Sequence, residues 1–489
     1  MKTTSYRLLC LVMWLLLLPL STLRAQVDTT WMAELPVIEL TYDTAAFSPE
    51  QYIPATFVYH SADSTCQLSC RIRHRGGTSL IYDKPNYAIK FIDEAGSPLD
   101  ASFLGMRSDN NWILDAMASD YAKMRNRVAM DLWLNTSRAP YHQEAEPKAV
   151  NGYRGEYVEV YANGDYYGVF CLTERVDRKQ LKLKKFRMNA DSTGLEHRGL
   201  LYKAVDGYMT RTPYFLYQKN VPDDALSHYD GVRAAYPNVH EGEPWSWTPL
   251  RNNIYYLADY GGATFMGGIG KRFDLPVFDD FILWRDLLYA YDNVGKNFYC
   301  WFYDQSSDDR RIGITPWDVD ASCGRDVLGM RVPATSTVET PNNYEVCMAE
   351  EYAGYRDTLC VRYAQLRDSL WGEDELLSYF ETYFDLLRRT GAWQREVDRW
   401  QDSNCKVLDI DIEQQYIHQW LHDRLVFLDA YYGYAREPEV AISTVRDERD
   451  AGSVSVDLWG RVGAREASAL PPAAGRGVVF YQGSFHIVH

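Results

Sequence analysis

Two carboxylates close together in the sequence, Asp318 and Asp320, are the residues best placed to do chemistry. They follow the apolar stretch 311–316, which is predicted to be a strand. Carboxylates two residues apart at a strand end can both reach one divalent cation, and oxygen atoms are the ligands that Mg²⁺ and Mn²⁺ prefer. A solvated turn has the same composition and is the simpler explanation of this motif taken alone.

A second motif runs from Asp292 to Asn297 and follows an apolar stretch with the pattern of a helix. This spacing is that of a protein-kinase catalytic loop, in which the Asp accepts the hydroxyl proton of the substrate and the Asn holds a metal ion. Ala290-Tyr291 stands where that loop has His-Arg. By itself the motif is better explained as a turn that ends the helix, because Asp and Asn side chains bond to their own backbone.

A third motif, at residues 71–90, could bind phosphate. Gly76 and Gly77 separate two predicted strands, and Lys90 follows 13 residues after Gly77 within the strand sequence YAIK. Glycines let backbone N–H groups approach a polyphosphate, and a Lys in a strand supplies a fixed positive charge. A hairpin that contains glycine and an outward-facing Lys is the commoner origin of such a pattern when it stands alone.

The order of these motifs strengthens their interpretation. A glycine loop, a strand Lys, a helix, a hairpin, a helical region, Asp-x4-Asn, a strand and a final Asp follow one another along the chain. Protein kinases deploy their functional parts in this same order. Three weak signals in one order and with sensible gaps therefore favour a phosphotransferase.

The elements that must position these residues change character along the chain. Alternating apolar residues predict strands at 36–60, 66–75 and 86–93, then a helix from Met124 and a hairpin at 156–174 that turns at Asn163-Gly164. From Asp274 onward the pattern is helical, and one predicted helix has an apolar face formed by Ile417, Trp420, Leu421, Leu425 and Leu428.

These patterns predict an α+β fold with two lobes and a cleft between them. The β-rich lobe is expected at about 36–180 and the helical lobe at about 273–435. Residues 188–272 have weak periodicity and are interpreted as an insertion. A small β unit is expected at 438–489, and it resembles the C-terminal β segments of some exported bacterial proteins; a plain terminal hairpin explains it equally well.

The N-terminus predicts export. Residues 1–25 carry Lys2 and Arg7, a short apolar run at 8–20 and a small residue, Ala25, at the expected cleavage point, which is the pattern of a signal peptide. No later stretch is apolar enough to cross a bilayer, so the mature protein is expected in the periplasm, at the cell surface or outside the cell.

The composition narrows the class of partner. The formal net charge is −16, which argues against a general nucleic-acid binder. Basic residues nevertheless gather at 71–90 and 175–187. Eight cysteines remain after residue 25 without a CxxC motif, so structural zinc is not expected. Their pairing cannot be deduced from the sequence, although Cys66 and Cys70 could close a small loop.

Four stretches resemble the CotH family, namely KPNYAIKF, NWILDAMASDYAKMRNRVAMDLW, YVEVYANGDYYGVFCLTERVD and ITPWDVDASCG. The resemblance covers about residues 36–435. It implies a divergent protein-kinase-like fold of two lobes, and a phosphotransferase that uses ATP with Mg²⁺ or Mn²⁺. The substrate implied is a Ser or Thr of a secreted or surface protein.

The resemblance also implies roles for individual residues. Gly76, Gly77 and Lys90 would bind the nucleotide, with Asp131 the nearest candidate for the acidic partner of Lys90. The backbone of Glu174 would contact adenine at a hinge. Asp292 would be the catalytic base, and the metal ligands would be Asn297, Asp318 and Asp320.

Two other functions remain open. A kinase-shaped surface, structural or ligand-binding protein without catalysis would carry the same motifs. A carbohydrate-active enzyme that uses Asp318 and Asp320 is disfavoured. Neighbouring carboxylates share a metal more readily than they flank a glycosidic bond, which requires carboxyl groups about 5 Å apart or more.

Overall fold

The computed structural model describes residues 35–46, 50–188, 195–196, 198–205, 228–229, 232–237, 247–259, 262–338 and 343–435, and four short strands between 454 and 488. The predicted signal peptide lies outside the described residues. The contacts between residues group the chain into two compact units, residues 1–434 and residues 435–489.

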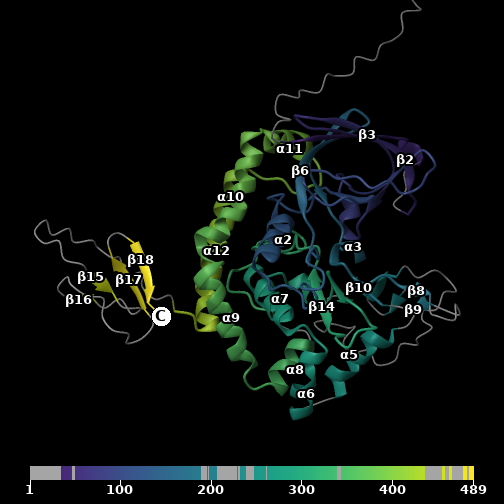
Figure 1. Ribbon diagram of the computed structural model, residues 1–489. Coiled ribbons are helices and arrows are strands. Elements are labelled where there is room, and N and C mark those ends of the chain that lie inside the picture. The colour runs from purple at the N-terminus through teal and green to yellow at the C-terminus, as the bar shows by residue number, and fades with distance from the viewer. Residues whose placement is uncertain are drawn as a thin grey trace, which may run out of the picture. The chain divides into compact units, whose positions relative to one another are not determined.

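Seven strands of the first unit close into a barrel in the order β1-β2-β3-β4-β5-β7-β6 (Figure 1, purple to blue). Neighbouring strands are antiparallel except for the parallel pair of β1 and β6, which closes the barrel. The bounds are β1 (Val37–Tyr42), β2 (Ile53–His60), β3 (Thr65–Arg75), β4 (Asn86–Ile92), β5 (Asn111–Asp115), β6 (Gly155–Ala162) and β7 (Asp165–Thr173).

The alternation of apolar residues along these strands produces the barrel interior. Ile72, Ile89, Phe91, Trp112 and Phe170 are all buried in one cluster there. The β6–β7 hairpin turns at Asn163-Gly164, as predicted, with φ of 52° and 90° at these two residues. Positive φ at both central positions is the geometry that matches the twist of the flanking strands, and Asn and Gly adopt it most readily.

A second sheet follows the barrel, with strand order β11-β12-β10-β13-β14. It contains β10 (Leu200–Ala204), β11 (His228–Tyr229), β12 (Val232–Tyr236), β13 (Phe298–Phe302) and β14 (Ile312–Pro316). β10 pairs with β13 along its whole length. The 188–272 segment therefore supplies strands to this sheet, among them the direct neighbour of β13.

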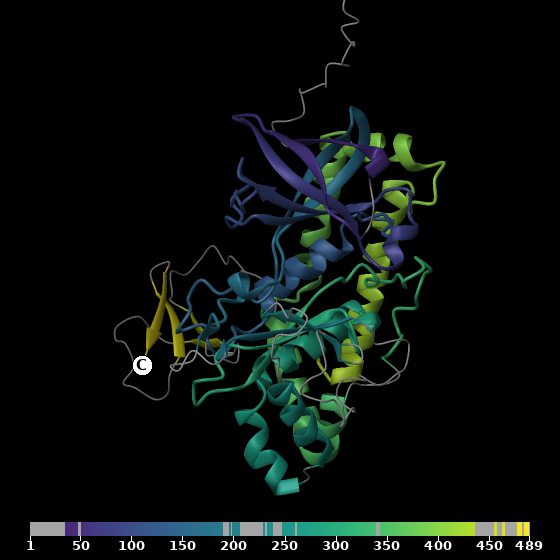
Figure 2. The same cartoon turned by 90° about the vertical axis from the view of Figure 1, so that its right-hand side faces the viewer.

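Helices account for most of the remainder of this unit. They are α2 (Arg125–Thr136), α3 (Arg178–Leu181), α5 (Thr248–Asp259), α6 (Gly262–Gly268), α7 (Leu275–Leu288), α8 (Asn343–Glu351), α9 (Tyr355–Ser369), α10 (Glu373–Arg389), α11 (Ala392–Trp400) and α12 (Ile410–Tyr432). The barrel lies at one end of the unit and α5 and α6 at the other (Figure 1, Figure 2). The predicted apolar face of α12 is buried.

A buried ion pair ties the barrel to α11. The Lys84 ammonium lies 2.7 Å from Oε1 of Glu396, and both side chains are fully buried. Oε2 of Glu396 accepts a hydrogen bond of 2.8 Å from the backbone N–H of Val169 in β7. Gly168 has φ of 100°, and a Cβ there would lie 2.1 Å from the same carboxylate, so only glycine allows this approach.

The α+β prediction is confirmed, with a barrel followed by a largely helical region. In the second unit, β15 (Val454–Val456) pairs with β16 (Val462–Ala464), and β17 (Gly477–Tyr481) pairs with β18 (Ser484–Val488). All eight cysteines of the described residues are free thiols, so the 66–70 loop is not closed by a disulfide. No helix among the described residues is both long and apolar enough to span a membrane.

A buried carboxyl in α7, Asp279, makes stability depend on pH. Burial raises its pKa to about 7 from an ordinary value of 3.8, although the charge of Arg138 opposes this. The folded protein therefore binds a proton that the unfolded chain releases, so the contribution of Asp279 to stability is fully present below about pH 4 and is lost as the pH rises through about 7.

Asp279→Asn is expected to raise the free energy of unfolding by a few kcal/mol at pH 8, because the amide carries no charge to bury. The gain should shrink towards pH 5, which urea denaturation at both pH values would measure. Asp385→Asn on the exposed face of α10 is the matched control. A stabilisation by Asp279→Asn that is equal at pH 5 and pH 8 would contradict this account.

Candidate functional site

The β13–β14 hairpin brings two of the sequence motifs together. Asn297 directly precedes β13, and Trp317 directly follows β14. The backbone N–H of Trp317 donates a hydrogen bond of 3.0 Å to the backbone carbonyl of Asn297. Because the strands are antiparallel, the 292–297 loop and Asp318 meet at the open end of the hairpin. Asn297 and Asp318 have φ of 59° and 56°, a conformation that Asn and Asp adopt more readily than most residues.

Asp292 is held by its own loop, which begins with the short 3-10 helix η4 (Tyr291–Asn293). Its Oδ2 accepts a hydrogen bond of 2.7 Å from Nδ2 of Asn297, and its Oδ1 lies 3.0 Å from the Lys296 ammonium. Burial raises the pKa of Asp292, the charge of Asp318 adds to this, and Lys296 opposes it. Asn293, which was not among the predicted site residues, donates hydrogen bonds of 2.7 Å and 2.9 Å to the carbonyls of Asn297 and Trp317.

Asp320 lies among further acidic groups. Burial, together with the charges of Asp318 and Asp115, raises its pKa to about 7. Asp115, at the end of β5, accepts a 3.0 Å hydrogen bond from Nδ2 of Asn126, whose Oδ1 accepts one from the Val319 N–H. Asn126 thus links the end of β5 to the turn that carries both predicted metal ligands.

The charge of Asp318 therefore acts on three further carboxylates, namely Asp115, Asp292 and Asp320. No group of three or more His, Cys, Asp or Glu side chains within the described residues is already gathered as a metal site. The donor set still fits a hard divalent cation, because it offers several carboxylate oxygens whose charges repel one another. Asp318 is exposed and accessible to such an ion.

Basic side chains face this acidic group from two other elements. The Lys203 ammonium in β10 lies 5.2 Å from the Trp317 ring centroid, and the Arg75 guanidinium at the end of β3 lies 5.6 Å from it. The pKa of Lys203 is lowered to about 8, chiefly by burial and also by the charge of Arg75, while the charge of Asp318 opposes this shift. The positive charge of Arg175, just after β7, also lowers the pKa of Lys203.

The predicted glycine loop begins directly after Arg75. Gly76 has φ of 129°, and a Cβ there would lie 1.9 Å from Oγ of Ser79, so this turn requires glycine. Gly77 precedes the 3-10 helix η2 (Thr78–Ile81). The loop thus directs the chain away from β3 at the point where Arg75 faces Trp317.

Lys90 lies elsewhere on the barrel surface. It pairs with Arg71 in β3, and its ammonium lies 4.3 Å from the centroid of the Tyr52 ring. Asn86, the partner of Arg75, is four residues away, or roughly 13 Å along the strand. No contact within the described part of the chain joins Lys90 to the four carboxylates. Asp131 pairs with Arg127 and not with Lys90.

Glu174, just after β7, is buried and bonds to three residues from other parts of the chain. Its carboxylate accepts hydrogen bonds from the backbone N–H of Arg107 and from the side chains of Arg154 and Gln180. Burial opposes ionisation, but these bonds lower the pKa of Glu174. Its own N–H donates to the Arg154 carbonyl at 2.9 Å and is therefore already engaged.

Several residues at this site were missed from sequence, namely Arg75, Asp115, Ser119, Asn126, Arg175, Lys203 and Asn293. Ser119 belongs to the site because its hydroxyl donates a 2.6 Å hydrogen bond to Asp320. Arg75 and Arg175 belong to the two basic segments noted above, which was a usable signal. Asp115, Ser119 and Asn126 fall within one of the stretches that carry the family resemblance. Lys203 had no signal, because β10 lies in the segment interpreted as an insertion.

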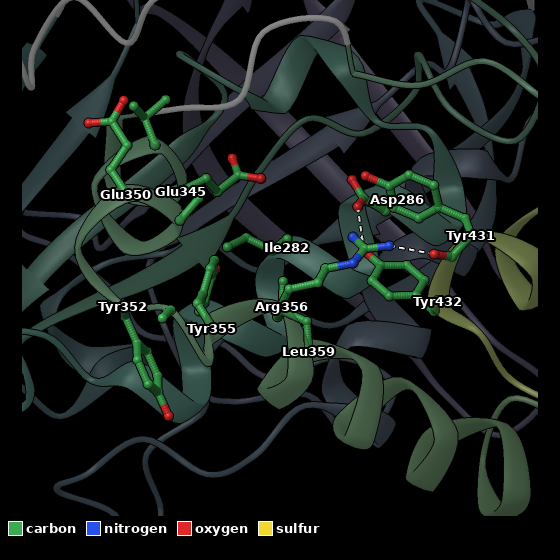
Figure 3. A pocket seen from close by; sticks show the side chains of 13 residues that line it. Ile282, Asp286, Glu345, Glu350, Tyr352, Tyr355, Arg356, Leu359, Tyr431 and Tyr432 are labelled. Atoms are coloured by element: carbon green, nitrogen blue, oxygen red, sulfur yellow. Dashed lines mark hydrogen bonds between the residues drawn. The ribbon is translucent and has the colours of Figure 1, made fainter.

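A separate pocket of about 360 Å³ lies between α7, α8, α9 and α12 (Figure 3). Its walls include Asp286, Glu345 and four tyrosines, and Arg356 lies across the rings of two of them, Tyr431 and Tyr432. None of the residues predicted from sequence lines it.

Comparison with known proteins identifies the family. No curated protein matches the chain. The family model described as CotH kinase protein matches residues 72–428, which include the barrel strands from β4 onward, the second sheet and most of the helical region. Because this match extends over well more than half of the sequence and contains every residue of the acidic site, the chain belongs to the CotH kinase protein family.

Proposed function

We propose that the chain is an exported atypical protein kinase that transfers the γ-phosphoryl group of ATP to a Ser or Thr of a secreted or surface protein. The observation that carries this proposal is the open end of the β13–β14 hairpin. There the 292–297 loop and Asp318 lie together, and Lys203 and Arg75 face them. Membership of the CotH kinase family supports phosphotransfer, and the signal-peptide pattern supports export.

The acidic residues are suited to a metal–nucleotide complex. Asn297, Asp318 and Asp320 would hold Mg²⁺ or Mn²⁺, which when bound supplies neutralisation of charge on the phosphates. Opposite them, Lys203 and Arg75 would bind phosphate oxygens through charged hydrogen bonds. In the kinase-like arrangement proposed here, ATP lies between the barrel and the helical region.

Asp292 is the candidate catalytic base. It would accept the proton of the acceptor hydroxyl while that oxygen bonds to the γ-phosphorus and ADP leaves. The contacts with Lys296 and Asn297 hold its carboxylate in one orientation, which is the positioning that phosphoryl transfer chiefly requires.

The first test of this function is nucleotide binding. ATP with Mn²⁺ at about 100 times the dissociation constant is expected to stabilise the purified protein by about 2.7 kcal/mol, seen as a rise in unfolding temperature. ATP alone and Mn²⁺ alone should each give a smaller rise, because the acidic and basic groups are satisfied together only by the complex.

A flat result would favour the other candidate. If ATP with Mn²⁺ leaves the unfolding temperature unchanged, the site is vestigial, and the chain is a kinase-like surface, structural or ligand-binding protein. A shift followed by transfer of label from γ-labelled ATP to casein or to the protein itself would support the kinase.

A further inference from the structure

Ser119 makes a short contact with one of the candidate metal ligands. Its Oγ donates a hydrogen bond of 2.6 Å to Oδ2 of Asp320, across a sequence separation of 201 residues. Ser119 lies in the loop between β5 and α2, whereas Asp320 lies in the turn after β14. A carboxylate held through one oxygen has its second oxygen fixed in direction as well.

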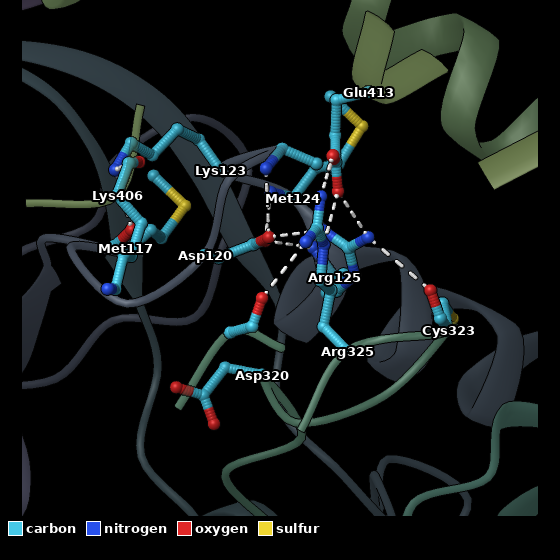
Figure 4. Close-up of polar contacts among 12 residues, drawn as sticks. Met117, Asp120, Lys123, Met124, Arg125, Asp320, Cys323, Arg325, Lys406 and Glu413 are labelled. Carbon is cyan, nitrogen blue, oxygen red and sulfur yellow. Dashed lines mark hydrogen bonds and ion pairs between the residues drawn. The ribbon is translucent and has the colours of Figure 1, made fainter. Parts of the chain in front are cut away.

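Arg125 is bonded to both chain segments that form this contact. Its Nη1 lies 2.6 Å from Oδ1 of Asp120, the neighbour of Ser119. Its Nε donates at 3.0 Å to the carbonyl of Ser322, and its Nη2 at 3.4 Å to that of Cys323, just after Asp320. Figure 4 shows Arg125 between Asp120 and Cys323.

The Arg125 guanidinium is held by two carboxylates, those of Asp120 and Glu413. Asp120 also accepts hydrogen bonds from the backbone N–H groups of Ala122, Met124 and Arg125, which attaches the loop to the start of α2. Glu413, in the first turn of α12, lies 2.6 Å from Nη2 of Arg125 and also pairs with Arg325 (Figure 4). The side chains of Arg125 and Glu413 are fully buried.

Such buried charges are a poor source of stability. Apolar side chains of similar volume often stabilise a protein as well or better, because charges lose their hydration on burial. What a guanidinium adds is direction, since its planar fork fixes several acceptors at once. Here the acceptors are the carboxylate of Asp120, which follows Ser119, and the carbonyls of Ser322 and Cys323, which follow Asp320.

We propose that Ser119 and Arg125 are positioning residues for Asp320. Ser119 orients the carboxylate, and Arg125 holds the two chain segments so that the Ser119–Asp320 contact persists. This inference rests on the proposed function, because it takes Asp320 to be a ligand of the metal.

The test is Mn²⁺ affinity, measured from the electron paramagnetic resonance signal of free Mn²⁺ with a non-hydrolysable ATP analogue present. Ser119→Ala is expected to weaken Mn²⁺ binding about tenfold, the size of effect seen when a group that orients a metal ligand is removed. Ser119→Thr keeps the hydroxyl and should restore the affinity. Ser369→Ala in α9, whose hydroxyl bonds its own helix, should bind like the wild type.

Arg125→Lys gives an independent measurement. Lys keeps the charge beside Asp120 but loses the fork that reaches Ser322 and Cys323, so Mn²⁺ binding should again weaken about tenfold. Arg285→Lys is the matched control, because Arg285 is also buried but pairs with Asp286 and Glu345, which lie outside the turn that carries Asp320.

The possible outcomes distinguish a failure of this inference from a failure of the proposed function. Wild-type affinity in Ser119→Ala, or equal losses in Arg125→Lys and Arg285→Lys, would overturn the positioning roles and leave the kinase proposal standing. Absence of Mn²⁺ binding in the wild-type protein would overturn the metal-dependent function, and the inference with it.

Discussion

Asp318→Asn is expected to reduce phosphoryl transfer by about a thousandfold or more while leaving the fold intact, since preorganised charge at the reacting group is the largest catalytic contribution in such sites. Asp318 is exposed, and its φ of 56° is one that Asn also adopts readily. The substitution therefore removes one negative charge from the group of four carboxylates without straining the turn.

Initial rates of label transfer from γ-labelled ATP with Mn²⁺ measure this effect, and thermal unfolding checks the fold. Asp308→Asn is the matched control, because Asp308 is an exposed carboxylate in the loop at the closed end of the same hairpin. Equal rates in wild-type protein and Asp318→Asn would remove Asp318 from the catalytic site. Equal losses in both variants would assign the effect to the hairpin as a whole.

Lys203→Met is expected to lower kcat/KM for ATP about a hundredfold, whereas Lys90→Met should remain close to wild type. A hydrogen bond from a charged donor contributes about 1.5–3 kcal/mol, and each 1.4 kcal/mol is a factor of ten. Lys203 lies beside Trp317, next to the candidate metal ligands, while Lys90 lies over Tyr52 on the barrel.

The pair of variants decides between two assignments. The family resemblance assigns the nucleotide to Lys90, and the geometry favours Lys203. Met preserves the length and volume of each side chain, and at position 203 it also removes the cost of burying a charge, so stability should not fall. A large loss in Lys90→Met with normal activity in Lys203→Met would restore the assignment to Lys90.

Local patterns in the sequence were sufficient for most of the elements that carry the site. Alternation of apolar residues predicted the strands at 66–75 and 86–93, and Asn163-Gly164 predicted the hairpin between β6 and β7. The five apolar residues of α12 are buried as their spacing predicts. These features depend on neighbours within a few residues along the chain, so a single sequence contains the information for them.

Long-range pairing decided which side chains meet. Lys203 reaches Trp317 only because β10 is the neighbour of β13 in the second sheet, and that strand order leaves no trace in local periodicity. Asp115 and Asn126 join the turn at 317–320 because β5 and the start of α2 end beside it. Such pairings depend on contacts between segments up to 193 residues apart in the sequence.

The sequence by itself determined the α+β character, the two acidic motifs and their order along the chain, because each is encoded in residue type and short-range spacing. Only the tertiary structure decided that the open end of one antiparallel hairpin joins those motifs, and that Lys203 and Arg75 lie against Trp317 while Lys90 lies over Tyr52. The physical reason is register: the strand order and pairing fix which face a side chain occupies, and both are settled by the packing of the whole unit.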